Sequence, residues 1–227
     1  MSIRLLDCTL RDGGYINDWK FGYRTAKSII QKLVDPNADY VEVGFLRNCS
    51  YDKNATLFNN IAELKKILPR EQKNTKFTVM ALHNKYDITK LEPNDGTVEA
   101  VRVTFHDYDI DEGLEFVKKV MEKGYKCFCN PINIMGYSDQ EILNLIQKIN
   151  QIKPYAFSIV DTFGSMIKSD LLRIYSLLEH NLDKSIVIGL HLHENLSLSY
   201  SLAQEFIGMR NVNRDCVIDG SLMGMGR

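Results

Sequence analysis

Apolar and polar positions follow one another along this chain in two alternating patterns. Short, mainly apolar runs, typical of buried β-strands, are each followed by a segment with the apolar spacing of an amphipathic helix. The expected strands are residues 2–9, 39–45, 76–82, 98–105, 125–133, 155–162, 185–193 and 215–222. The expected helices are residues 23–34, 55–68, 109–124, 138–150, 168–181 and 197–209, and the polar segment after residue 82 has room for a short one. This alternation predicts a parallel sheet with helices packed outside it.

The number of expected strands narrows the fold. Eight strands in 227 residues favour a closed (β/α)8 TIM barrel over an open doubly wound sheet. The glycine-rich strand–turn–helix signature of dinucleotide-binding sheets is absent from the sequence. The pattern ends at "GSLMGMGR" (residues 220–227), directly after the eighth strand and without an eighth helix. We therefore expect one TIM-barrel domain over residues 1–227, forming the N-terminal part of a longer protein.

Charge and composition exclude some classes of partner. The chain has 28 basic and 29 acidic residues, which gives no electrostatic reason to bind nucleic acid or an anionic membrane. It has no apolar run of membrane-spanning length and no signal-peptide pattern. An odd number of cysteines, five, suggests reduced thiols in a cytoplasmic protein. Cys127 and Cys129 could bind a metal, but buried packing is favoured because no second Cys/His pair has the spacing of a zinc site.

Polar residues gather where the expected strands end, which in a TIM barrel is the rim that carries the active site. The residues at this rim are Arg11, Asp12, Glu42, His83, His106, Asp107, Asn130, Asp161, Thr162, His191 and His193. This concentration of ionisable and amide side chains predicts an active site at the carboxyl ends of the strands.

The segment "HLHEN" (residues 191–195) carries the strongest local signal. Alternate residues of a strand face the same side, so His191 and His193 can hold one ion together. Asp12 is the natural carboxylate to complete a mixed nitrogen and oxygen site, and the two glycines after it would let the backbone approach a ligand. The alternatives are two hydrogen-bonded barrel histidines and, for Arg11 with Asp12, a structural ion pair.

Taken together, "DCTLRDG" (residues 7–13), "HLHEN" and "DGSLMGMGR" (residues 219–227) resemble the HMG-CoA lyase-like superfamily of metal-dependent barrels. The resemblance covers essentially the whole chain, and the 4-hydroxy-2-oxovalerate aldolases are the most similar members. It implies that Asp12, His191 and His193 bind a divalent metal ion, Mn2+, Mg2+ or Zn2+. It also implies that Arg11 steadies an enolate and that Glu42 supports Arg11.

The chemistry that this resemblance implies is cleavage of a carbon–carbon bond in a 4-hydroxy-2-oxo acid, giving pyruvate or a homologue and an aldehyde. A metal chelated by the 2-oxo acid would stabilise the enolate, and Arg11 would add a fixed positive charge. The aldolases place a histidine base where this chain has Tyr15, so His83 and His106 are further candidates for the base.

Other rim residues and relatives are weighed in the same way. Gly13, Asn130, Asp161 and Thr162 are expected to line the substrate pocket, although residues 161–164 could instead form a strand-to-helix turn. The absence of lysine around Asn130 argues against a biotin-dependent carboxyltransferase. Gly14 and Tyr15, where the Claisen-condensing relatives have glutamate and glutamine, argue against a synthase.

Two further readings remain open. Loss of the base could leave a regulatory barrel that binds metal and a 2-oxo acid without turnover. The chain could also cleave a thioester, as HMG-CoA lyase does. The expected partners are a small 2-oxo acid and either a second copy of the chain or a C-terminal partner domain.

Overall fold

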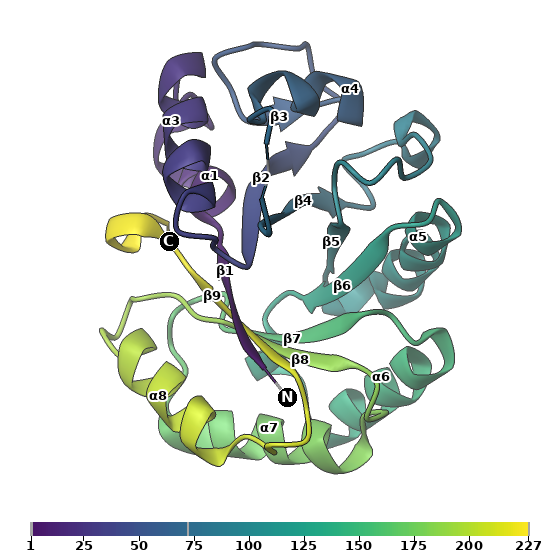
Figure 1. Cartoon of the computed structure of the whole chain (residues 1–227). Helices are drawn as coiled ribbons and strands as arrows, with labels where there is room; N and C mark the ends of the chain where they lie inside the picture. The colour runs from purple at the N-terminus through teal and green to yellow at the C-terminus, as the bar shows by residue number, and fades with distance from the viewer. Residues whose placement is uncertain (1, 72, 227) are drawn as a thin grey trace.

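In the computed structural model, which describes residues 2–71 and 73–226, eight parallel strands close into a barrel (Figure 1). β1 pairs with β9 on one side and with β2 on the other, which closes the ring. The barrel strands are β1 (Ile3–Asp7), β2 (Tyr40–Leu46), β4 (Lys76–Leu82), β5 (Ala100–Phe105), β6 (Lys126–Pro131), β7 (Ala156–Val160), β8 (Val187–His191) and β9 (Cys216–Gly220). The predicted (β/α)8 barrel is confirmed.

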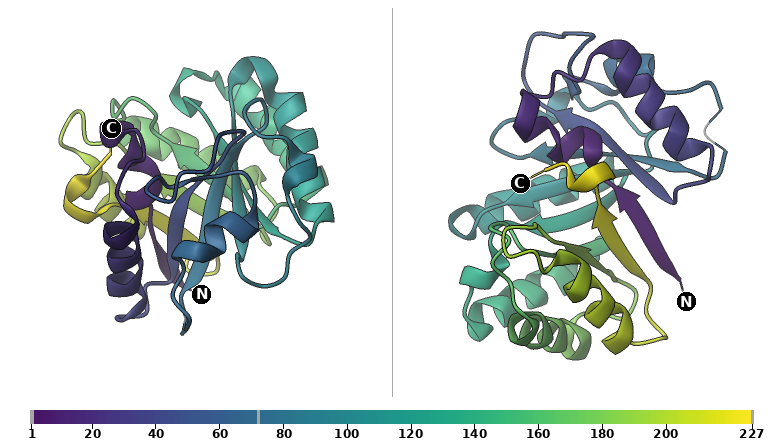
Figure 2. Two further views of the ribbon diagram at one scale, coloured as in Figure 1. Left: turned by 90° about the horizontal axis from the view of Figure 1, so that it is seen from above. Right: turned by 90° about the vertical axis from the view of Figure 1, so that its left-hand side faces the viewer.

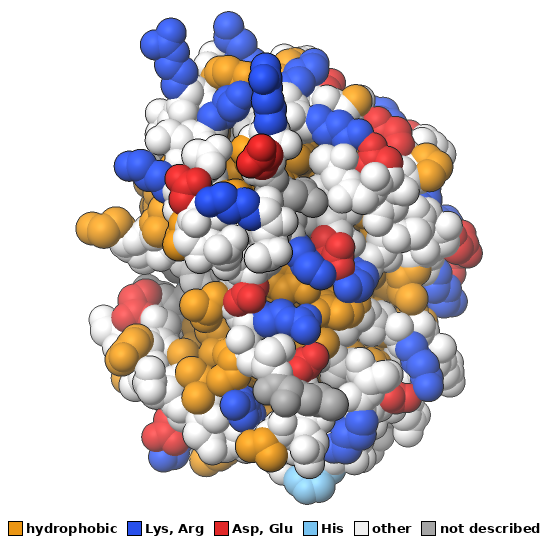
Figure 3. All heavy atoms as spheres, viewed as in Figure 1, with side chains coloured by type: hydrophobic (Ala, Val, Ile, Leu, Met, Phe, Trp, Pro, Cys, Tyr) orange, Lys and Arg blue, Asp and Glu red, His pale blue; other side chains and the backbone are white. Residues whose placement is uncertain are grey.

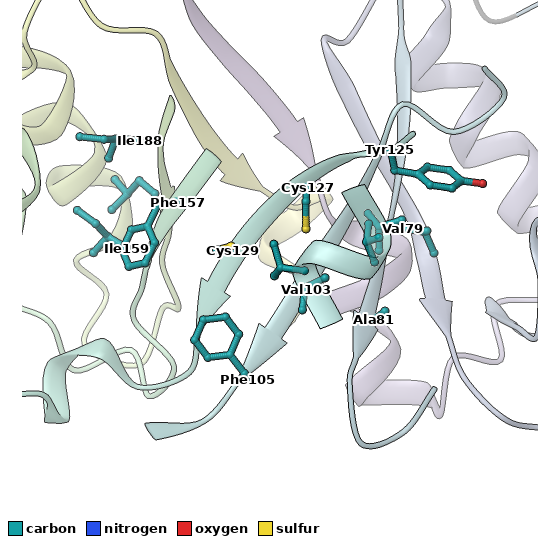
Figure 4. Close-up of a cluster of buried hydrophobic side chains, with 14 of the residues drawn as sticks. Val79, Ala81, Val103, Phe105, Tyr125, Cys127, Cys129, Phe157, Ile159 and Ile188 are labelled. Atoms are coloured by element: carbon teal, nitrogen blue, oxygen red, sulfur yellow. The ribbon is translucent and has the colours of Figure 1, made fainter. Parts of the chain in front are cut away.

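Helices pack around the outside of this barrel and contribute apolar side chains to the main hydrophobic core. The long ones are α3 (Tyr23–Val34), α5 (Ile110–Glu122), α6 (Asp139–Ile152), α7 (Lys168–Asn181) and α8 (Ser199–Met209). Outward side chains of the strands, among them Val103, Phe105 and Phe157, fill the layer between sheet and helices (Figure 4). Cys127 and Cys129 are free thiols that are fully buried in this layer, so the packing interpretation of this pair is confirmed.

The helix predicted over residues 55–68 is wrong in its first part. Residues Leu57–Phe58 form a short strand, β3, against the edge of β2, and α4 begins only at Ile61 (Ile61–Leu64), followed by the 3-10 turn η1 (Lys65–Ile67). The cause is a β-bulge in β2, where Gly44 has a φ of 143° and a Cβ there would lie 2.1 Å from the Thr56 carbonyl oxygen. That close approach lets the Thr56 carbonyl accept a hydrogen bond from Phe45 N at 3.0 Å, so the backbone here is extended.

The expected first strand, residues 2–9, also ends early. The Asp7 carboxylate accepts hydrogen bonds from the backbone N–H and the hydroxyl of Thr9, at 3.0 and 2.9 Å, and these bonds turn the chain. The helical turns α1 (Thr9–Asp12) and α2 (Gly14–Asn17) follow. Arg11 and Asp12 therefore lie on a helical turn at the carboxyl end of β1 rather than on the strand itself.

Shorter 3-10 turns complete the connections. They are η2 (Ile88–Lys90) in the polar segment after β4, η3 (Asp107–Asp109), η4 (Ile134–Gly136) and η5 (Leu222–Gly224). Within the described residues, no helix is long and apolar enough to cross a membrane.

The outer face of β1 and β9 carries no helix in the described part of the chain, because only η5 follows β9. The right-hand view of Figure 2 shows both strands facing the viewer, between α8 and the N-terminal helices. Leu5 on β1 is 61% exposed, and hydrophobic side chains are visible beside this region in Figure 3. Arg227 lies outside the described residues, so the expected extension of the protein beyond it stays a prediction.

Candidate metal centre

Asp12, His191 and His193 converge at the carboxyl end of the barrel, and we refer to them as the Asp–His–His cluster. Their ligand atoms all lie within 4.8 Å of one another, and all three residues are buried. His193 Nε2 is 3.2 Å from both Asp12 Oδ2 and His191 Nε2, and His191 Nε2 is 4.0 Å from Asp12 Oδ2. The proximity predicted from "HLHEN" and Asp12 is thus present, and the cluster could hold a metal ion.

The second nitrogen of each imidazole fixes which atom faces the cluster. His193 Nδ1 donates to the backbone carbonyl of Thr162 at 2.8 Å, and His191 Nδ1 donates to the carboxylate of Asp219 at 2.8 Å. Each neutral ring then presents the lone pair of Nε2 to the centre, beside the oxygen of Asp12. Three acceptor atoms directed at one another fit a cation between them, so the residues present suit a divalent metal.

Burial and nearby charges keep the cluster in its ligand form. Burial, aided by the positive charge of Arg11, lowers the pKa of His191, so the neutral imidazole is favoured. Burial opposes ionisation of Asp12, but the neighbouring positive charge, above all that of Arg11, outweighs it and holds the pKa of Asp12 well below its usual value. A neutral imidazole and an ionised carboxylate are the forms that bind metals.

Arg11 is oriented by two carboxylates and keeps one nitrogen unused. Its Nε donates to Glu42 Oε2 at 2.7 Å, and its Nη1 donates to Asp12 Oδ1 at 2.5 Å. Its Nη2 is buried and has no hydrogen-bond partner among the described residues. Burial opposes the charge of Arg11, but Glu42 and Asp12 hold its pKa well above the usual value. Arg11 is therefore a permanent cation with a free donor beside the Asp–His–His cluster.

Two buried residues that were not predicted, Arg102 and Asp219, link these groups into a ring. Arg102 lies on β5 and is fully buried; it donates through Nη1 to Glu42 at 3.1 Å and through Nη2 to Asp219. Asp219 on β9 in turn accepts from His191. We call this closed circuit the charge ring; its members are Asp12, Arg11, Glu42, Arg102, Asp219, His191 and His193.

The formal charge of the charge ring has a chemical consequence. Two arginines and three carboxylates leave one net negative charge when both imidazoles are neutral. A divalent cation would turn this into one net positive charge, which a monoanionic ligand would balance. Since unbalanced charge in a buried site is unfavourable, the ring suits one divalent ion together with one monoanion.

Of the expected pocket residues, two are engaged in loop structure. Both carboxylate oxygens of Asp161 accept backbone N–H groups, from Ser165 at 3.0 Å and from Met166 at 3.1 Å, as in a strand-to-helix turn. The Thr162 hydroxyl accepts from the N–H of Asn133 at 2.7 Å. Asp161 and Thr162 therefore shape the segment whose carbonyl holds His193.

Asn130 and Gly13 occupy different surroundings. Asn130 is buried at the end of β6, where its side-chain oxygen accepts from Ser158 Oγ at 3.4 Å. The expectation that the glycines let the backbone approach a ligand stays a prediction, and the space beside both glycines is taken by atoms of the protein itself. A Cβ on Gly13 would lie 2.5 Å from the Thr9 carbonyl, and one on Gly14 would lie 2.1 Å from the Trp19 ring. The two glycines make room for the protein's own backbone and indole.

The candidate bases lie in two places. Tyr15, on α2, is 38% exposed, and its ring packs edge-on against Trp19 at 4.9 Å between centroids. His106 follows β5, which lies across the barrel from β9. Its ring stacks on that of Tyr108, with 4.7 Å between the ring centroids. His83 Nε2 is 3.2 Å from Asp109, which also faces His106. Tyr15 is thus near Arg11 along the chain, whereas His83 and His106 share a carboxylate on the far side.

A cavity of about 840 Å3 reaches the Asp–His–His cluster. The three cluster residues belong to its lining, together with apolar side chains that include Leu33, Ile207 and Leu222. A small ligand can therefore reach the cluster from solvent.

Comparisons with known proteins agree with this fold. A family model described as HMGL-like matches residues 2–227. The N-terminal domain of a proposed aldolase from Bacteroides vulgatus is 23% identical, with a TM-score of 0.77 over 99% of this chain and 74% of that one. HMG-CoA lyase from Bacillus subtilis is 15% identical, with a TM-score of 0.73 over 99% and 78%. The carboxyl transferase domain of Rhizobium etli pyruvate carboxylase, with pyruvate and biocytin, is 14% identical, with a TM-score of 0.75 over 99% and 40%. These structures share the fold.

Proposed function

The chain belongs to the HMGL-like family, and from that membership and the Asp–His–His cluster we propose that it is a metal-dependent carbon–carbon lyase of the aldolase type. Its substrate would be a 4-hydroxy-2-oxo acid, cleaved to pyruvate or a homologue and an aldehyde, or formed from them. The metal would be Mn2+, Mg2+ or Zn2+.

The unused donor of Arg11 is the observation that carries this proposal. Nη2 is buried, belongs to a permanently charged group and has no partner in residues 2–71 and 73–226, and the Nη1 of the same side chain bonds the cluster residue Asp12. A buried charged donor without an acceptor is unfavourable unless a ligand supplies one. The oxygens of a 2-oxo acid are acceptors of the right charge and planarity for a guanidinium.

The cluster would hold the metal through Asp12, His191 and His193. When bound, such an ion supplies Lewis-acid stabilisation of negative charge on oxygen. Arg11 would stabilise the same developing charge from its own side, because its plane is fixed by Glu42 on one edge and by Asp12 on the other. Glu42 is fully buried and forms ion pairs with both Arg11 and Arg102, so it fixes the positions of both guanidinium groups.

A proton must also leave the 4-hydroxyl group when the bond breaks. Tyr15 and His106 are the candidates for this acceptor, Tyr15 from α2 and His106 from the end of β5. They can be separated because deuterium exchange at the methyl group of pyruvate needs no hydroxyl proton. The residue that takes the hydroxyl proton is the one whose loss stops cleavage and leaves exchange in place.

A coupled assay tests the proposal. The protein is incubated with Mn2+ and 4-hydroxy-2-oxo acids that differ in the aldehyde portion, and released pyruvate is followed with lactate dehydrogenase and NADH. We expect pyruvate release that EDTA stops, and loss of release in Arg11→Lys, which keeps the charge but not the planar fork. Binding of 2-oxo acids without release from any substrate would favour the regulatory barrel, and release from a coenzyme A thioester would favour the thioester lyase.

A further inference from the structure

Arg47 lies at the carboxyl end of β2, beyond the bulge that displaces the strand between Glu42 and Phe45. Glu42 faces the barrel interior, where it meets Arg11 and Arg102. After the bulge, Phe45 packs with Trp19 and Met80. Arg47, two residues further along the chain, places its guanidinium over the same aromatic pair, at the mouth of the barrel.

The guanidinium of Arg47 packs against aromatic rings, and no described residue forms an ion pair with it. Its Cζ lies 5.2 Å from the ring centre of Trp19 and 5.4 Å from that of Phe45. Its Nε is buried without a hydrogen-bond partner, and no carboxylate of residues 2–71 and 73–226 lies within salt-bridge distance. The cation is thus fixed in direction but not neutralised.

Trp19 connects Arg47 to the candidate site. Its indole N–H donates to the backbone carbonyl of Arg11 at 2.8 Å, and its ring occupies the space that Gly14 leaves free. The ring of Tyr15 lies against the same indole and is 6.5 Å from that of Phe45. One indole therefore contacts the backbone that carries Arg11 and also supports Arg47.

Cation–π packing alone would explain the position of Arg47 but not the lack of an acceptor at its buried Nε. A half-buried arginine usually gains an anionic or carbonyl partner, because desolvation without one is unfavourable. The charge ring balances with one divalent ion and one monoanion, so it offers Arg47 no surplus negative charge. The positive charge of Arg47 at the carboxyl end of the barrel would therefore be balanced by a second anionic group on the ligand.

We propose that Arg47 binds a second anionic group, a carboxylate or a phosphate, at the end of the substrate remote from its 2-oxo acid. This inference rests on the proposed function and adds the substrate class, an aldol whose aldehyde portion is acidic. Arg47 is then a specificity-determining residue: it discriminates between anionic and uncharged aldehyde portions, while Arg11 and the cluster hold the 2-oxo acid end.

The test compares 2-oxo acids of equal length in the Mn2+-loaded protein by isothermal titration calorimetry. One arm pairs 2-oxoglutarate with 2-oxopentanoate, and a second pairs phosphohydroxypyruvate with hydroxypyruvate. We expect the dianion of at least one pair to bind about tenfold to a hundredfold more tightly, the range of one charge-assisted hydrogen bond. The preferred pair identifies carboxylate or phosphate. The preference should shrink in Arg47→Gln, persist in part in Arg47→Lys, and weaken as salt is raised.

Arg70→Gln is the matched control, because Arg70 is exposed and lies before β4, at the opposite end of the barrel. A ratio near one for both pairs in the wild type, or a ratio unchanged in Arg47→Gln, would overturn the assignment of Arg47. Deuterium exchange of pyruvate in the same wild-type samples separates the two proposals. If pyruvate exchanges but the dianions bind no more tightly than the monoanions, only the role of Arg47 is refuted. If no 2-oxo acid binds at all, both the role of Arg47 and the proposed lyase function are refuted.

Discussion

Replacing Asp219 with asparagine should weaken metal binding although Asp219 is not itself one of the three proposed ligands. Its carboxylate accepts the Nδ1 proton of His191 at 2.8 Å and forms an ion pair with Arg102. The substitution removes the charge that orients His191 and turns the net charge of the charge ring from minus one to zero. Both changes disfavour a cation at the cluster.

The magnitude follows from the single hydrogen bond that fixes the ligand. Partners of this kind change metal affinity by about tenfold to a hundredfold, or about 1.4 to 2.7 kcal/mol. Arg102 keeps Glu42 as a partner but loses Asp219, so a lower unfolding temperature is also expected. Affinity is therefore measured well below that temperature, by titrating Mn2+ and following the signal of the free ion by electron paramagnetic resonance.

Asp215→Asn is the matched control for this substitution. Asp215 precedes β9, is partly exposed, and pairs with Arg4 at 3.5 Å at the amino end of the barrel. It should leave Mn2+ affinity unchanged. A folded Asp219→Asn protein that binds Mn2+ within about twofold of the wild type would refute the reasoning, because the hydrogen bond to His191 would then have no effect on the site.

Two stability predictions follow from the N-terminal turns. Burial raises the pKa of Asp7 to about 6, so between about pH 4 and pH 6 the folded protein binds a proton that the unfolded chain releases. The stability that this proton contributes is fully present below about pH 4 and is lost as the pH rises through about 6. In urea unfolding, the free energy of unfolding of Asp7→Asn should therefore match that of the wild type near pH 4 and exceed it by about 1 to 3 kcal/mol near pH 8. A variant as stable as the wild type at both pH values would contradict this. Gly14→Ala should destabilise by about 1 to 3 kcal/mol and shift the emission of Trp19, the single tryptophan, to the red, since the new Cβ would lie 2.1 Å from its ring. Gly208→Ala, with nothing within 4 Å, is its control and should be neutral or stabilising, and equal effects of the two changes would refute the packing argument.

The parts of the fold that sequence predicts well are those decided locally. The helices at residues 23–34 and 168–181 occur with the expected bounds, because their apolar spacing and their neighbouring strands agree. The helix predicted over residues 55–68 does not form at residues 55–60, because the local pattern and the neighbouring strand disagree there. Their apolar pattern permits a helix, but after the bulge at Gly44 the carbonyls of Thr56 and Phe58 accept hydrogen bonds from Phe45 and Arg47, contacts that the local pattern does not contain.

The candidate site divides in a similar way. Asp12, His191 and His193 could be chosen from residue type and the rule that strand ends form the rim. Arg102 bonds Glu42, 60 residues away, and Asp219, 117 residues away, across the interior of the barrel. The only sequence signal for Arg102 is a charge within the apolar strand "AVRVTF", and a charge alone does not name its partners. The charge ring depends on closure of the barrel and emerges only in three dimensions.

Exchange of the methyl hydrogens of pyruvate in D2O tests the central claim most directly, because it requires enolate formation and no particular aldehyde. Proton NMR would follow the methyl signal in the presence of Mn2+, with EDTA, His193→Ala and His180→Ala as comparisons. His180 is exposed on α7 and its ring bonds the Ser176 carbonyl, so its loss should not matter. The account predicts exchange that EDTA and His193→Ala abolish and His180→Ala preserves. Absence of exchange in the wild type at saturating Mn2+, or exchange that survives both EDTA and His193→Ala, would contradict it.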